Sequence, residues 1–418
     1  MQSAENQYRD ERVPFWILLA LAAYTTSFVV EAPLRFALGK IGAPQILYLR
    51  DLLLVLLVIT SFWMYMFSGK HLKSSRIVIA LLAMGSVVAW LWFLGRFMQV
   101  LFAVKIFMPL LVCCIYGKAI SSANIHLAKL SVFLATVTAI GVIVNSVVAF
   151  PWVGSAVSLG GLQIEVSREW YSGDFARLAG FARASYDAAT YMIIFSLVIA
   201  VAYKPLIGIF FWALSAVVVV LTTTKGVFLA FGFLSIILLC KLISKEVMVG
   251  SAKVILIIAA IVGLLLPLVS LVFQPEMIFS SKIERILLFS FYDRMNNTWP
   301  QALYMLDEWF KIFIGRGIGG FGAPQAYFES RLYNPADNIW VYFIVSFGAL
   351  GAIGVLYVIG KILFFRRFDD GKTVGLVWAV FVAVYGITSN MVDNAVLCMA
   401  MGYLISNFVF SHYKQVKV

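Results

Sequence analysis

Charged side chains are scarce in this chain of 418 residues. Asp, Glu, Lys and Arg together make up 12% of it, whereas 62% of the residues are hydrophobic and the mean hydropathy is +0.96. Water-soluble domains carry about twice that charged fraction, so the composition excludes a soluble globule. We therefore predict that a lipid bilayer is the solvent for most of the chain.

Histidine and cysteine are also rare, with three and four copies. His71, His126 and His412 lie far apart in segments predicted below to be cytoplasmic, which argues against a histidine-ligated zinc on the outer side. No nucleotide-binding fingerprint is present, because the glycine-rich stretch 315–322 lacks the Gly-Lys-Ser/Thr ending. We expect neither a metal nor a cofactor. All four cysteines fall inside apolar runs, which predicts buried hydrophobic residues and argues against a disulfide framework. They are Cys113, Cys114, Cys240 and Cys398.

Long apolar runs are abundant instead. A helix needs roughly 20 mostly apolar residues to cross the hydrocarbon core with its backbone hydrogen-bonded internally, and about twelve runs approach this length. They predict an all-α polytopic membrane protein with about twelve transmembrane helices and a helical periplasmic loop region, forming a single membrane domain over residues 1–418. The runs are Val13–Val30, Ile46–Phe67, Ile77–Gly95, Phe97–Gly117, Leu127–Phe150, Ser185–Tyr203, Leu206–Leu221, Gly226–Leu242, Val254–Phe273, Asn338–Leu363, Thr373–Ile387 and Ala395–Phe410.

Lysine and arginine concentrate on one side of the predicted spans. With the N-terminus inside, the cytoplasmic segments collect 17 of these bases against six acids, whereas the opposite side has 13 of each. Loops rich in Lys and Arg stay in the cytoplasm, so we expect a multi-pass membrane protein with both termini cytoplasmic. This asymmetry accounts for nearly all of the net charge of +12 without a nucleic-acid partner. The first apolar run is too long for a signal-peptide h-region and is predicted to be an uncleaved anchor.

Two polar excursions lie on the predicted periplasmic side, at residues 151–184 and 274–337. In the second, apolar residues recur at three- and four-residue steps over Pro300–Ile314, which predicts one amphipathic helix along the membrane face. Five glycines between positions 315 and 322 then interrupt regular structure. Because these arginine-bearing segments interrupt an otherwise apolar chain, we expect the chemistry to lie there.

Arginines near membrane boundaries mark both excursions: Arg177, Arg183, Arg294 and Arg316 lie among aromatic or glycine residues. A guanidinium group binds phosphate in bidentate fashion, so such a cluster suits a lipid-linked pyrophosphate. The plainer interpretation is that each base pairs with a nearby acid or a lipid headgroup. We favour that interpretation for Arg168, Lys282, Arg285, Lys311 and Arg331.

Several short motifs carry a family resemblance. In chain order they are Arg177-Leu178-Ala179-Gly180 followed by Phe181–Ala189, Thr222-Thr223-Thr224-Lys225-Gly226, Gly315-Arg316-Gly317-Ile318-Gly319, Asp337-Asn338 and Gly348-Ala349-Leu350-Gly351. Together they resemble the O-antigen ligase and O-antigen polymerase superfamily of integral membrane glycosyltransferases. The ligases resemble one another in having histidine before the asparagine, where this chain has Asp337, and this departure favours the polymerase branch. Lys225 stands where family members usually place arginine.

The resemblance implies a protein of the bacterial inner membrane. It also implies periplasmic polymerisation of oligosaccharide repeat units linked to undecaprenyl pyrophosphate, for O-antigen, capsule or exopolysaccharide. Its implied partners are that lipid-linked oligosaccharide, membrane lipids and a chain-length regulator protein. The pyrophosphate is an activated leaving group, so the implied glycosyl transfer is metal-independent. Catalytic roles fall to Arg177, to Asp337 as base and to Asn338. Substrate-binding roles fall to Arg183, Lys225, Arg294, Arg316, Gly180, Gly317 and Gly319.

Alternatives stay open at the level of the sequence. An O-antigen ligase would use the same donor with a lipid A-core acceptor, whereas a flippase or other transporter would place charges at the membrane midplane. Asp337 precedes an apolar helix and fits an N-cap as well as a base. Gly348 and Gly351 are expected to allow close helix packing, and Lys105, inside a span, to line the lipid path. Rival bases are Glu165, Glu169, Asp174 and Asp187.

Overall fold

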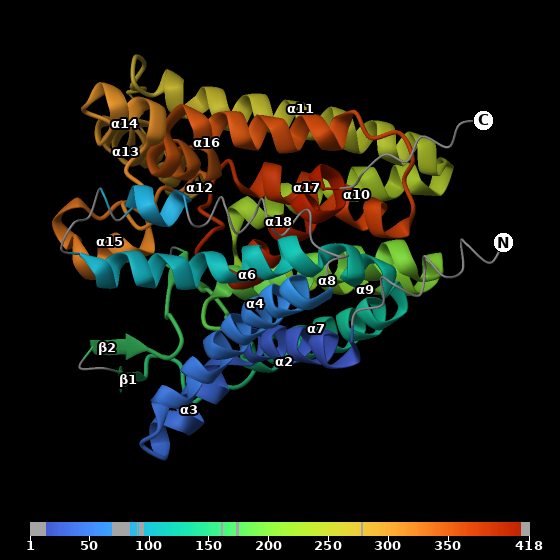
Figure 1. Cartoon of the computed structure of the whole chain (residues 1–418). Helices are drawn as coiled ribbons and strands as arrows, with labels where there is room; N and C mark the ends of the chain where they lie inside the picture. The colour runs from blue at the N-terminus through green and yellow to red at the C-terminus, as the bar shows by residue number, and fades with distance from the viewer. Residues whose placement is uncertain are drawn as a thin grey trace.

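The computed structural model describes residues 14–68, 84–89, 91, 96–159, 162–172, 175–276 and 279–410. Helices dominate these residues, and the strands among them form two short antiparallel hairpins. The long helices lie side by side, roughly along one direction (Figure 1). The all-helical prediction is confirmed.

Eight helices in the described part of the chain are long and apolar enough to cross a membrane. The bent pair α2 (Phe15–Val29) and α3 (Glu31–Lys40), which meet at 81°, would make a ninth span if counted as one. These helices support the predicted transmembrane character. The eight are α4 (Tyr48–Ser68, preceded by the 3₁₀ turn η1, Pro44–Leu47), α6 (Phe97–Ser122), α7 (Asn124–Asn145), α8 (Ser185–Ala202), α9 (Pro205–Thr222), α10 (Lys225–Ile243), α11 (Lys245–Val269) and α16 (Ile339–Leu363).

The prediction of twelve spans is not confirmed. The last two apolar runs form α17 (Asp370–Tyr385) and α18 (Ala395–Leu404), the latter continued by the π-helical turn η4 (Ile405–Val409), and both are shorter than the eight. Asn394 fixes the start of α18 by accepting a hydrogen bond from the Leu397 N–H, so the polar residues before it remain non-helical. The predicted run over residues 77–95 lies mostly outside the described residues.

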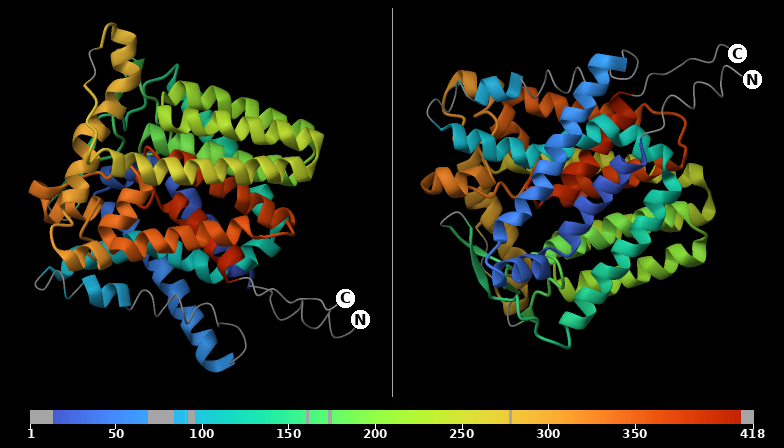
Figure 2. Two further views of the ribbon diagram at one scale, coloured as in Figure 1. Left: turned by 90° about the horizontal axis from the view of Figure 1, so that it is seen from above. Right: turned by 60° about the horizontal axis from the view of Figure 1, so that its bottom comes forward.

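The two predicted excursions gather at one end of the bundle, on the left of Figure 1, and α12, gold in Figure 2, projects from it. The first excursion forms hairpins that the sequence did not predict, β1–β2 (Ala156–Leu159, Leu162–Glu165) and β3–β4 (Tyr171–Ser172, Phe175–Ala176). The second contains α12 (Lys282–Asp293), the π-helical turn η2 (Arg294–Thr298), α13 (Trp299–Tyr304), α14 (Trp309–Ile314), α15 (Ala323–Phe328) and the 3₁₀ turn η3 (Ser330–Leu332).

The amphipathic helix predicted over Pro300–Ile314 is two helices. The chain leaves the helical path between α13 and α14, where Glu308 has an extended backbone (φ −120°, ψ 143°). Asp307 and Glu308 accept hydrogen bonds from the Lys311 ammonium at 2.5 and 3.0 Å. These two acids precede α14, where negative charge is favourable at a helix start, so they mark a new helix that apolar periodicity alone does not reveal.

A break in α16 lets the second excursion contact this helix closely. Gly348 adopts a left-handed backbone (φ +63°), and a Cβ there would lie 2.3 Å from the Phe313 carbonyl carbon. The backbone N–H groups of Arg316 and Gly317 donate to the carbonyls of Val345 and Ser346, both at 2.8 Å. The close packing predicted at Gly348 is therefore present, between α16 and the end of α14.

Candidate functional site

A large cavity opens among the elements at this end of the molecule. Its volume is about 1590 Å³, which exceeds the roughly 300–1,000 Å³ typical of small-molecule pockets. Residues from α2, α3, α4, α6 and α8 line it, together with both excursions, the α9–α10 junction and the connection between α17 and α18. A site of this size and composition can hold a long polar ligand.

Ten basic and five acidic side chains of the described residues line the cavity. Some of them neutralise each other: Glu31 pairs with Arg35 and Arg50 at 2.5 and 3.2 Å, and Asp51 pairs with Lys105 at 2.8 Å. Lys105 thus faces the cavity and is paired with Asp51. The remaining surplus of positive charge favours an anionic ligand.

Arg177, in the first excursion, contributes one of the positive charges that line the cavity. Its Nη2 donates to the Thr224 hydroxyl at 3.3 Å, and its guanidinium lies 5.6 Å from the Trp170 ring centre. The Nε atom is buried and has no hydrogen-bond partner within the described residues. Burial also lowers the pKa of the Arg177 guanidinium, which still stays protonated at neutral pH. A buried cation with an unused donor is what an anion-binding site requires.

Arg183 and Lys225 also line the cavity. The Nε of Arg183, like that of Arg177, is buried without a hydrogen-bond partner in the part of the chain that the structure describes. Lys225 is the first residue of α10, and its ammonium donates to the Ile286 carbonyl of α12. Arg177 and Arg294 are both close enough to repel that ammonium. Both excursions and the α9–α10 junction therefore contribute to one cationic region.

Asp337 lies in the cavity wall and pairs with Arg294. The Nε and Nη2 atoms of Arg294 lie 3.2 and 3.1 Å from Asp337 Oδ2, and its Nη1 donates to the Ser290 hydroxyl at 2.6 Å. No hydrogen bond to Asp337 Oδ1 is found among the described residues. Burial raises the pKa of the Asp337 carboxyl, although Arg294 acts in the opposite direction. One carboxylate oxygen is thus held by a cation while the other can accept a proton.

The backbone at this carboxylate is strained. Ala336 and Asp337 both have left-handed conformations, with φ of +67° and +47°. Such angles are unfavourable for residues other than glycine, and they concentrate at functional sites. Asp337 pairs with Arg294 and is not the N-cap of α16.

Asn338 takes the capping position instead. Its Oδ1 accepts from the N–H groups of Trp340 and Val341 at 2.7 and 3.1 Å, and its Nδ2 donates to the carbonyls of Gly263 and Ile387, both at 3.1 Å. Asn338 is fully buried and does not line the cavity. The geometry therefore gives Asn338 a structural role, in place of the catalytic role implied by the resemblance.

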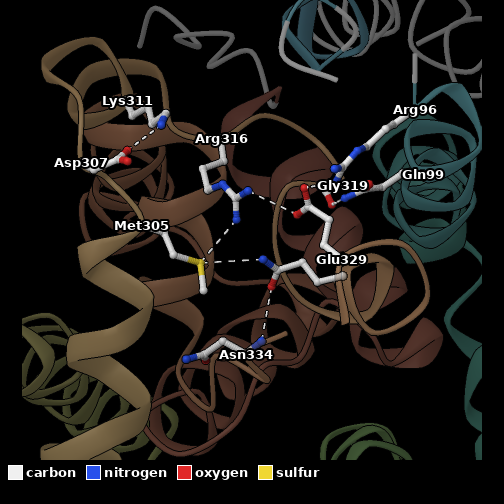
Figure 3. A network of polar contacts seen from close by, with 10 residues as sticks. Arg96, Gln99, Met305, Asp307, Lys311, Arg316, Gly319, Glu329 and Asn334 are labelled. Atoms are coloured by element: carbon white, nitrogen blue, oxygen red, sulfur yellow. Dashed lines mark hydrogen bonds and ion pairs between the residues drawn. The ribbon is translucent and has the colours of Figure 1, made fainter. Parts of the chain in front are cut away.

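Arg316 also lies outside the cavity. Its Nη2 is 3.2 Å from the buried Glu329 carboxylate, and its Nη1 points at the Met305 sulfur at 3.4 Å. Arg96 pairs with the same carboxylate (Figure 3). Since Glu329 already neutralises it, Arg316 is not placed to bind the substrate that the resemblance implies.

The three predicted glycines support the site from outside, because none of them lines the cavity. Gly180 has φ +62°, and a Cβ there would lie 2.7 Å from the backbone of Gly141 and Val142 in α7. Gly317 and Gly319 pack in the same way against backbone atoms of Ala89 and Gln99. Close backbone contact, rather than substrate binding, accounts for glycine at these positions.

The rival bases differ in whether they line the cavity. Glu165 and Glu169 do not line the cavity, and Asp174 lies outside the described residues. Asp187 lines the cavity and accepts a hydrogen bond from Asn394 at 2.6 Å. Asp393, which the sequence reasoning missed, also faces the cavity.

The plainer interpretation holds for Lys311, which pairs with Asp307 and Glu308 outside the cavity. Arg168, Lys282 and Arg285 line the cavity, whereas Arg331 does not. No group of His, Cys, Asp or Glu that could hold a metal ion occurs among the described residues.

No protein-family model, no curated protein and no solved structure matches this chain. Fold and site together define a polytopic helical membrane protein with a large cationic cavity at one end.

Proposed function

We propose that this chain is an inner-membrane glycosyltransferase that polymerises oligosaccharide repeat units carried on undecaprenyl pyrophosphate, with its cavity on the periplasmic side. The observation that carries the proposal is that Arg177, Arg183, Lys225, Arg294 and Asp337 all line one cavity. These residues come from both excursions and the α9–α10 junction, and the motifs that resemble the polymerase family contain all of them except Arg294.

In the proposed reaction, a sugar hydroxyl of the incoming lipid-linked unit attacks the anomeric carbon of the growing glycan. The new C–O bond forms as the bond from that carbon to pyrophosphate breaks, and the electron pair leaves with the pyrophosphate oxygen. Asp337 Oδ1 accepts the hydroxyl proton, while Arg294 holds Oδ2. Arg177 and Arg183 stabilise the negative charge that develops on the leaving group.

Variants of two of these residues test the proposal in a host strain that lacks the chromosomal gene. Arg177→Ala removes a fixed cation at the leaving group and is expected to slow elongation by about 10²–10³-fold. Asp337→Asn removes the base and is expected to cost about 10²–10⁴-fold. The length distribution of the surface glycan reports both. Full-length chains from either variant, present at normal levels in the membrane, would show that the assigned residues are wrong.

Matched controls lie at the same end of the molecule. Arg331→Ala and Asp307→Asn make the same chemical changes at exposed positions that do not line the cavity, and both are expected to leave chain length unchanged.

Disruption of the gene separates the proposal from its alternatives. Loss of a polymerase leaves surface glycan with a single repeat unit, and loss of a ligase leaves none attached. Loss of a flippase traps lipid-linked units on the cytoplasmic side. Only the first outcome agrees with the proposed function.

A further inference from the structure

The connection between α17 and α18, residues 386–394, contributes a second polar wall to the cavity. Its lining side chains are Thr388, Ser389, Asn390, Val392, Asp393 and Asn394. None of them takes part in the proposed transfer chemistry. The helices on either side of this connection are apolar. A polar connection between them that opens to a cavity indicates a ligand-binding surface.

Asp393 is the central group of this wall. Asn390 Nδ2 donates to its Oδ2 at 2.8 Å, and the backbone of Ala323, the first residue of α15, lies close to the same carboxyl. Its side chain remains exposed, and the space it faces is the cavity. Arg168 and Tyr333 lie near enough to interact with it electrostatically. The carboxylate is therefore fixed in direction while keeping acceptor capacity for a ligand.

Asn394 extends the same surface. It donates to Asp187 Oδ1 at 2.6 Å while its own oxygen caps α18. Next to this pair, the Trp170 ring packs against Tyr186 at 5.7 Å between centres. Carboxylates and amides bond hydroxyl groups in both directions, and aromatic faces pack on apolar ring surfaces. This combination suits a neutral ligand rich in hydroxyl groups.

The polar wall adjoins the cationic wall, which is the part of the cavity lined by Arg177, Arg183, Lys225 and Arg294. Tyr385, the last residue of α17, lies within electrostatic range of Arg177, Asp187 and Asp337. One ligand can therefore contact both walls, with its phosphate on the arginines and its polar part on residues 388–394.

We propose that residues 388–394 form a subsite for a hydroxyl-bearing sugar ring of the lipid-linked oligosaccharide, with Asp393 and Asn390 bonding its hydroxyl groups. This inference rests on the proposed function and deepens it, because it assigns recognition of the sugar and recognition of the pyrophosphate to different walls of one cavity. The polar wall then determines which repeat unit binds, whereas the cationic wall binds the pyrophosphate whatever the sugars are.

Two probes separate the walls in purified protein held in lipid nanodiscs. Geranylgeranyl pyrophosphate carries the phosphates and an isoprenoid chain without any sugar, and lipid-linked repeat units extracted from the host carry both. Asp393→Asn is expected to raise KM for the repeat unit about tenfold, the worth of one hydrogen bond to a charged group, with kcat within about twofold. Its affinity for geranylgeranyl pyrophosphate is expected to equal that of the wild type, which also shows that the variant is folded. Asp307→Asn is the matched control and is expected to change neither value.

A second measurement does not depend on the Asp393 variant. Ser389→Cys places a thiol on the polar wall, where a maleimide reagent can label it. Free repeat-unit oligosaccharide, released from its lipid by mild acid, is expected to slow this labelling, whereas geranylgeranyl pyrophosphate is not.

The outcomes are distinct. An unchanged KM for Asp393→Asn, or labelling that the free oligosaccharide does not slow, would overturn the sugar subsite and leave the proposed function standing. Equal loss of affinity for both probes would show that Asp393 serves the phosphate. A wild-type protein that neither binds geranylgeranyl pyrophosphate nor elongates repeat units would overturn the proposed function, and the subsite with it.

Discussion

At the scale of single residues, Arg177 and Arg316 show how surroundings decide the role of the same side chain. Arg177 lies in the cavity wall with a buried nitrogen that lacks a partner within the described residues, whereas Arg316 is paired with the buried Glu329. The first has a free donor in the cavity, and the second is paired outside it. Sequence context marked both equally, because each is an arginine close to glycines at a predicted membrane boundary.

Arg316→Ala is therefore expected to affect stability before activity. Removing one cation from a buried pair leaves Glu329 with Arg96 alone and should lower the free energy of unfolding by about 1–3 kcal/mol. Thermal unfolding in detergent measures this change. Arg177→Ala is expected to leave the unfolding temperature near that of the wild type. A reversed pattern, with Arg316→Ala stable but inactive, would return Arg316 to the substrate site.

The pH dependence of the proposed reaction follows from Asp337. Burial raises the pKa of its carboxyl, so the carboxylate needed as a base is lost as the pH falls through a value above the ordinary one of about 3.9. Arg294 lowers this pKa, whereas the neighbouring Asp293 raises it. Arg294→Gln should therefore move the acid limb of the kcat/KM profile to higher pH. Lys311→Gln, whose side chain lies outside the cavity, serves as the control, and coincident acid limbs for wild type and Arg294→Gln would exclude Asp337 as the base.

At the scale of elements, the first excursion is held in place by its contact with α7. Gly180 donates its backbone N–H to Asn145 Oδ1 at 3.1 Å, and its carbonyl accepts from the Trp152 indole at 3.2 Å. Arg177 and Arg183 flank this contact within three residues on each side. The position of the cationic wall therefore depends on a close backbone approach that only glycine permits.

Gly180→Ala tests this dependence. Its left-handed backbone should cost about 1–2 kcal/mol with any other residue, and the added Cβ would clash with α7 at 2.7 Å. We expect a lower unfolding temperature and a loss of elongation. Gly354→Ala, in α16 with nothing within 4 Å of the added atom, is the control and should be neutral or stabilising by about 0.5–1 kcal/mol. Normal elongation by Gly180→Ala would show that the contact does not position the arginines.

The sequence predicts the long helices well, because an apolar run of sufficient length has one stable form in lipid. It also identifies both excursions and five of the ten bases that line the cavity, namely Lys105, Arg177, Arg183, Lys225 and Arg294. It does not predict that Asn338 caps α16 while Asp337 pairs with Arg294, since either residue type fills an N-cap. It also misses Asp393, because residues 386–394 come close to the excursions only in the folded chain. The run of polar residues from Thr388 to Asn390, between two short apolar segments, is the signal that could have revealed it.

At the scale of the whole molecule, the distribution of charge predicts which end faces the periplasm. Asp307 lies at the end that carries the excursions, and Asp369 precedes α17; both side chains are largely exposed. In intact spheroplasts, we expect a membrane-impermeant thiol reagent to label Asp307→Cys and to leave Asp369→Cys unlabelled until the membrane is opened. The four native cysteines lie within helices, three of them buried, and provide the background. The opposite pattern would place the cavity in the cytoplasm and contradict the proposed function.

Arg177 and Arg183 each have a guanidinium nitrogen without a partner among the described residues, and this has a kinetic consequence. Groups that stabilise a departing diphosphate also retain it once it has left, so release of undecaprenyl pyrophosphate, rather than bond formation, is expected to limit turnover. A rapid burst of glycan transfer, equal to the enzyme concentration and followed by a slower steady rate, would reveal this. Added sugar-free lipid diphosphate should then act as a competitive inhibitor, and raising the salt concentration should relieve it. Between additions, each protein molecule would then stay occupied until undecaprenyl pyrophosphate returns to the membrane.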